Sequence, residues 1–92
     1  MEKKDDLTFD FMTNREILQI AEPKDELEKM ILEKAVKELG EFTTVDKLVK
    51  YLGLSTSFIR RAINSRKLVT YKIGRKMFVV TQSILNIIEV ME

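Results

Sequence analysis

The fold is decided by residues 45–80, which read VDKLVKYLGLSTSFIRRAINSRKLVTYKIGRKMFVV. In the first part of this stretch, apolar residues recur every three or four positions, as they do along one face of a helix. Thr43 or Thr44 can cap this first helix at its start, and Gly53 can end it. The apolar positions of the helix are Val45, Leu48, Val49 and Leu52.

A second helix begins three residues later. Ser55 is its predicted N-cap, and the apolar spacing predicts a helix from Thr56 to about Ser65. The residues expected to face inward are Ile59, Ala62 and Ile63. Because only residues 53–55 separate the two helices, the sequence predicts a helix-turn-helix with Leu54 buried in the turn.

Beyond Leu68 the apolar period changes from about four to two. Residues 69–73 and 76–80 are rich in β-branched and aromatic side chains, which predicts two strands. Gly74-Arg75 lies between them, and glycine at the first central position suits a type II′ turn. We therefore expect a β-hairpin whose tip carries Lys72, Arg75 and Lys76.

The flanking segments read as helices. The pattern predicts a short helix over about 14–21, an amphipathic helix over 24–39 and a closing helix over 81–91. Phe9 and Phe11 are expected to anchor the N-terminal arm. We thus expect a mainly α chain with a small hairpin, organised as an arm with a short helix (1–22), an amphipathic helix (23–40) and a region with the helix-turn-helix and hairpin (41–92).

Several short motifs occur together in this order: Thr43-Thr44-Val45-Asp46, Tyr51-Leu52-Gly53-Leu54-Ser55, Phe58-Ile59-Arg60-Arg61-Ala62-Ile63 and Tyr71-Lys72-Ile73-Gly74-Arg75-Lys76. With them, residues 42–88 resemble the excisionase-like branch of the MerR-type winged helix-turn-helix DNA-binding domains. The resemblance implies a winged helix-turn-helix fold preceded by an N-terminal helical extension, and binding of double-stranded DNA.

The charges are unevenly distributed. Residues 1–41 carry seven basic and twelve acidic side chains, whereas residues 42–92 carry nine basic and three acidic ones. Between Lys47 and Lys76 there are nine basic residues and no Asp or Glu. Such a window predicts a strong local positive potential, which is typical of a polyanion-binding surface.

The second helix has the dimensions and side chains to read the DNA major groove, where Arg bonds guanine and Asn bonds adenine. The hairpin tip can approach the adjacent minor groove or its phosphates. The candidate residues of the second helix are Ser55, Thr56, Ser57, Arg60, Arg61 and Asn64. The candidate residues of the wing and its flanks are Lys47, Lys50, Arg66, Lys67, Lys72, Arg75 and Lys76.

Several function classes lack the residues they need. The chain has no Cys and no His, which removes thiolate and histidine catalysis and the usual zinc sites. We expect no catalytic residue, metal or cofactor, and therefore no enzyme. No secretory signal or membrane span is expected, and we predict a cytoplasmic, nucleoid-associated protein.

The amphipathic helix can either pack back on the domain or pair with a second copy. We favour pairing, through Leu27, Met30, Ile31 and Leu39. The leading hypothesis is a small sequence-specific DNA-binding protein, either a transcription regulator or an excisionase-like architectural factor, acting as a homodimer or cooperative array. The alternative is a protein-interaction adaptor that docks on a recombinase, a polymerase or another replication protein.

Overall fold

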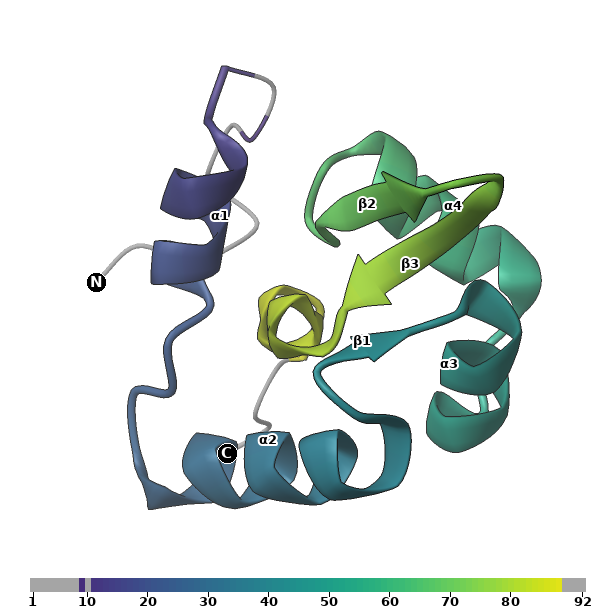
Figure 1. Ribbon diagram of the computed structural model, residues 1–92. Helices are drawn as coiled ribbons and strands as arrows, with labels where there is room; N and C mark the ends of the chain where they lie inside the picture. Colours follow the sequence, from purple (N-terminus) through teal and green to yellow (C-terminus); the bar gives the residue numbers. More distant parts are fainter. Residues whose placement is uncertain (1–8, 10, 89–92) are drawn as a thin grey trace.

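Helices surround a small antiparallel sheet in the computed structural model, which describes residue 9 and residues 11–88 (Figure 1). In chain order the elements are α1 (Asn14–Ile20), α2 (Glu26–Leu39), β1 (Phe42–Thr43), α3 (Val45–Leu52), α4 (Thr56–Asn64), β2 (Thr70–Ile73), β3 (Lys76–Val80) and the 3₁₀-helix η2 (Thr81–Asn86). The protein is therefore mainly helical with a three-stranded sheet.

The two central helices lie where the sequence predicts them. The Thr44 hydroxyl accepts a hydrogen bond from the Lys47 amide (3.3 Å), and the Ser55 hydroxyl accepts one from the Phe58 amide (3.1 Å). Gly53 ends α3 in the left-handed conformation, with φ +68°, which favours glycine. The expectation that Leu54 is buried is wrong: its side chain is exposed, because caps and glycine already hold the turn.

The predicted hairpin is present, and it carries a third strand that the sequence did not reveal. The strand order is β1-β3-β2, with both pairs antiparallel. Gly74 in the β2–β3 turn has φ +63°, the positive value that the predicted type II′ turn requires at its first central residue. β1 pairs through only Phe42 and Thr43, and a strand this short leaves no alternating pattern to detect.

A single apolar cluster joins five of the elements. Its buried side chains come from α2, α3, α4, the start and end of the hairpin, and η2: Ala35, Leu48, Ile59, Ala62, Leu68, Val79 and Ile84. The amphipathic helix α2 thus contributes to the same core as the helix-turn-helix. In Figure 1 it runs beneath η2, against which it packs. Packing back on the domain, one of the two expected outcomes, is what the structure shows.

A second cluster attaches the arm and α1. Phe9 and Ile17 are buried with Val69, and Val80 packs against them from the sheet. Phe9 is therefore an anchor, as predicted. Phe11 is 94% exposed, and the same expectation for it is wrong. It lies just before α1 and belongs to neither apolar cluster.

The predicted helix over residues 81–91 is also wrong in kind. Residues 81–86 form a 3₁₀-helix, and residues 89–91 lie outside the described part of the chain. Side-chain hydrogen bonds hold this tighter winding: the Thr81 hydroxyl donates to Gly40 O (2.6 Å) and the Ser83 hydroxyl to Val80 O (2.6 Å). The prediction that this segment closes the core is confirmed, since Ile84 and Leu85 are fully buried.

Helix α1 begins with a capping box. The Glu16 amide donates to the Thr13 hydroxyl (3.2 Å), and the Thr13 amide donates to the Glu16 carboxylate (3.0 Å). These hydrogen bonds, the one from the backbone first, lower the pKa of Glu16 from its ordinary value of 4.5. Helix α2 starts at a second cap, where Asp25 accepts from the Glu28 amide (2.8 Å).

Two isoleucine-to-alanine variants compare the loss of stability at a buried position with the loss at an exposed one. We expect Ile84→Ala to lower the free energy of unfolding by about 2–5 kcal/mol, because it leaves a cavity where Ile84 is fully buried. The matched variant Ile73→Ala removes the same atoms from a side chain that is 61% exposed, and it should cost about 1 kcal/mol or less. Urea denaturation measures both values, and equal losses would contradict the assigned core.

Candidate nucleic-acid interface

The outward face of α4 carries an unbroken set of polar and basic side chains. Ile59 and Ala62 turn the opposite face into the core. The exposed set is Ser57, Arg60, Arg61 and Asn64. These positions are spaced i, i+3, i+4 and i+7, so they share one side of the helix. An α-helix with its side chains is about 10–12 Å across, which fits the roughly 12 Å width of the B-DNA major groove.

The start of α4 adds further polar groups. Thr56 and Ser57 are exposed, and the helix has no acidic residue in its first turn. The Ser55 oxygen is engaged as the N-cap acceptor, which leaves its O–H free to donate. Asn64 is the last helical residue, exposed, and Ser65 rather than Asn64 is the C-cap. An anion near this helix start would meet no opposing carboxylate on the helix itself.

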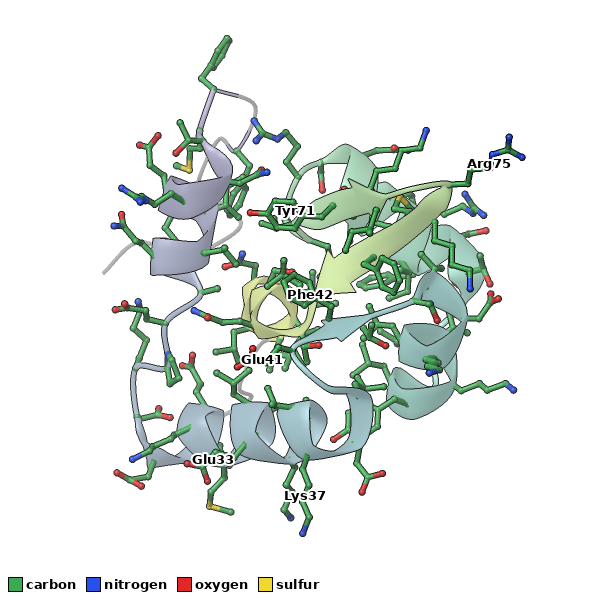
Figure 2. All side chains as sticks on the ribbon, viewed as in Figure 1. Glu33, Lys37, Glu41, Phe42, Tyr71 and Arg75 are labelled. Atoms are coloured by element: carbon green, nitrogen blue, oxygen red, sulfur yellow. The ribbon has the colours of Figure 1, made fainter. Side chains whose placement is uncertain are left out.

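The register of the hairpin divides its predicted basic residues between two faces. Lys72 pairs with Met77, and both lie on the same face as the buried Val79, which is the α4 side. Lys76 pairs with Ile73 and lies on the outer face. Arg75 sits in the turn, and Figure 2 shows its side chain extending away from the hairpin tip. The hairpin therefore offers Lys72 to the α4 side and Lys76 to the outer face, and Arg75 extends from its tip.

The first helix of the pair also presents basic groups. Lys47 and Lys50 are both exposed on α3, opposite the buried Leu48. Asp46 in the first turn of α3 is the one acidic residue in the sequence between residues 42 and 88. The described part of this region therefore keeps the strong positive charge that the sequence predicts.

Arg66 occupies an unusual place in the backbone. Helix α4 ends in a Schellman motif, in which the Arg66 amide donates to Ile63 O (3.0 Å) and the Lys67 amide donates to Ala62 O (3.0 Å). Arg66 is the residue after the C-cap and has φ +63°. Glycine usually fills this position, and a side chain there costs about 1 kcal/mol of backbone strain.

The guanidinium of Arg66 is engaged within the protein. It donates to the Phe9 carbonyl (3.4 Å) and to the Asn14 side-chain oxygen (3.0 Å). The sequence names Arg66 as a candidate DNA contact, and in the structure its guanidinium links Phe9 and α1 to the end of α4. Lys67 is half-buried, and its carbonyl accepts a hydrogen bond from the Asn86 side chain (2.9 Å).

Sequence reasoning missed one further surface, the outer face of the sheet. By register it carries Phe42, Tyr71, Ile73 and Phe78, beside Val80 and Lys76. The signal was in β3, where Met77, Phe78, Val79 and Val80 follow one another. A strand with apolar residues in consecutive positions has apolar side chains on both faces. A hairpin that exposes one face to solvent needs apolar side chains only on its other face.

Other kinds of site find no support. Among residues 9 and 11–88, no group of three or more Asp, Glu, Cys or His side chains could hold a metal ion. Within the same residues, no helix is both long and apolar enough to span a bilayer. No family model, curated protein or solved structure matches the chain, so the proposals below rest on its own residues.

Two substitutions at Arg66 test the role assigned to it. Arg66→Ala should lower the free energy of unfolding by about 1–3 kcal/mol, because the guanidinium hydrogen bonds are lost while the backbone strain remains. Arg66→Gly loses the same hydrogen bonds but relieves the strain, so it should be about 1 kcal/mol more stable than Arg66→Ala. Both variants lose the same charge. Thermal or urea unfolding compares them, and an alanine variant as stable as the glycine variant would refute this reading of the backbone.

Proposed function

We propose that the protein binds double-stranded DNA, with α4 in the major groove and the hairpin on the adjacent backbone or minor groove. The observation that carries the proposal is the exposed set Ser57, Arg60, Arg61 and Asn64 on one face of α4. These residue types match the donors and acceptors of the major groove. The layout of two capped helices followed by a hairpin supports the winged helix-turn-helix type that the sequence resembles.

The parts of this surface have different roles. Arg60, Arg61 and Asn64 are the candidates for reading base edges, whereas the Ser and Thr groups at the start of α4 are suited to phosphate. Lys47 and Lys50 on α3 flank the same unit and suit the neighbouring backbone. On the wing, Lys72 and Arg75 are the better placed of the basic residues. Binding of this kind involves no chemistry and matches a regulator of transcription or an architectural factor in DNA recombination.

The DNA proposal predicts a steep dependence of affinity on salt. If about five phosphates are neutralised per chain, log K should fall with log salt at a slope of roughly −4 to −5. Fluorescence anisotropy with a mixed-sequence duplex at low salt measures both affinity and slope. The double variant Arg60→Ala, Arg75→Ala should weaken binding by at least about tenfold and make the slope shallower.

A matched control variant tests whether a loss of DNA affinity comes from the proposed surface or only from the lower net charge. Lys29→Ala, Lys37→Ala removes the same charge from exposed positions of α2, and it should change affinity by less than about threefold because α2 lies outside the proposed surface. Equal losses in the two double variants would contradict the assigned surface. Absence of binding at low salt would contradict the function itself and favour an adaptor that docks on a recombination, replication or transcription protein.

We further propose that tight binding uses more than one copy, because one short reader helix and a wing bury little surface. Of the four residues predicted for pairing, Ile31 and Leu39 are partly buried within the domain. Leu27 and Met30 are each about half exposed and lie three residues apart on α2. The proposed contact between copies therefore uses two of the four predicted side chains, Leu27 and Met30.

Sedimentation equilibrium tests the pairing of copies. A self-association that Leu27→Ser, Met30→Ser weakens by about tenfold or more would support contact through α2. Leu54→Ser removes another exposed apolar side chain in the turn before α4 and should leave the association unchanged. A protein that stays monomeric both free and on DNA would exclude pairing.

A further inference from the structure

The outer face of the sheet exposes several large apolar side chains next to one another, as interaction surfaces often do. Ile73 is 61% exposed, Phe42 49% and Tyr71 42%, and Phe78 lies beside them. These side chains come from all three strands but share one face by register. In Figure 2 the labelled Phe42 and Tyr71 rings lie on this face, which is opposite to α4.

The two aromatic rings form a fixed unit. Their centroids are 6.1 Å apart with an interplanar angle of 79°, an edge-to-face pair that bridges β1 and β2 across β3. Such pairs are held in place by the strands beneath them, so little conformational entropy is lost when another surface covers them. Rigid exposed aromatic groups of this kind are enriched at the energetic centres of protein interfaces.

A shallow groove continues the face toward α1. It has a volume of about 320 Å³ and is lined by Arg15, Leu18, Gln19, Glu22, Tyr71 and Gln82. Gln82 is fixed by a hydrogen bond to the Leu18 carbonyl (3.1 Å), which keeps the groove floor in place. The groove is large enough for one bulky apolar side chain packed beside Tyr71, with Arg15 and Glu22 to bind polar groups at its rim.

The charges around the face are unequal at its two ends. At the hairpin end Arg75 and Lys76 stand together, and the sequence has no acidic residue between 47 and 88 to balance them. In the groove Arg15 and Glu22 offset each other. The positive hairpin end therefore favours an occupant that carries carboxylates there.

The occupant is better matched by protein than by single-stranded nucleic acid. Glu22 in the groove and Glu41 beside Phe42 would repel phosphates at the other end of the face (Figure 2). Ile73, its most exposed apolar side chain, has no ring on which a base could stack. A protein segment whose carboxylates lie only at the hairpin end meets neither obstacle, whereas the phosphates of a nucleic acid recur along its whole length.

We infer that the outer face of the sheet is a docking site for an amphipathic, acidic segment of a partner protein. Its apolar side chains cover Phe42, Tyr71 and Ile73, one of them entering the groove beside Tyr71, and its carboxylates face Lys76. Because α4 lies on the other side of the sheet, this site is open while α4 is occupied. The inference does not depend on DNA binding.

The test uses the full chain and two synthetic peptides. One carries Leu and Phe on one helical face and Glu on the other, and its twin has Lys in place of every Glu. In ¹H–¹⁵N NMR titrations the acidic peptide should shift the amides of Phe42, Tyr71, Ile73 and Phe78, and the basic twin should bind at least about tenfold more weakly. Binding of neither peptide, or equal binding of both, overturns the proposal.

Variants separate this face from the basic face of α4. Tyr71→Ser and Ile73→Ser, each made singly and checked by circular dichroism, should weaken peptide binding by at least about tenfold and leave DNA affinity unchanged. Arg60→Ala should leave peptide binding unchanged. Peptide shifts confined to α4, binding of a single-stranded oligonucleotide to the sheet face, or concentration-dependent self-association that Tyr71→Ser abolishes would each overturn it.

Discussion

The fold depends on the burial of the short 3₁₀ segment that follows the hairpin. Five of the six residues of η2 are buried, and Gln82 is the exception. The segment contacts α1, α2 and β3. Several of its polar side chains donate to backbone groups of distant elements, including the Asn86 amide, which donates to Lys67 O (2.9 Å) and Ile17 O (3.5 Å). Apolar packing and these specific hydrogen bonds together fix where the outer helices lie, and so decide which face of α4 and which face of the sheet stay exposed.

Local signals explain why so much of the central region could be predicted. The caps Thr44 and Ser55, the glycine stops and the change of apolar period each act over a few residues, and the helices and hairpin begin and end within a residue or two of their expected positions. Features set by distant contacts could not be read this way. Strand β1 exists only because β3 is beside it, and η2 departs from an α-helix because Gly40 and other remote backbone groups hold its side chains.

The same distinction holds for the candidate interface. The exposed face of α4 follows from helical spacing alone, so its residues could be named in advance. Whether a basic side chain makes internal contacts is decided by the tertiary structure, and those of Arg66 could not be foreseen because its partners Phe9 and Asn14 are more than fifty positions away in sequence. The division of the hairpin's basic residues between two faces could likewise be seen only from the strand register, because a one-residue shift would exchange the faces of Lys72 and Lys76.

The contribution of Ala35 to the common core limits how this protein can be divided. Ala35 lies in α2, before the start of the helix-turn-helix, and yet it is fully buried against elements that follow it. A fragment transplanted from residue 41 onward would expose apolar surface that α2 now covers. Helix α4 and the hairpin are therefore not an exchangeable module, and any fusion or graft that retains their shape must carry α2 along with them.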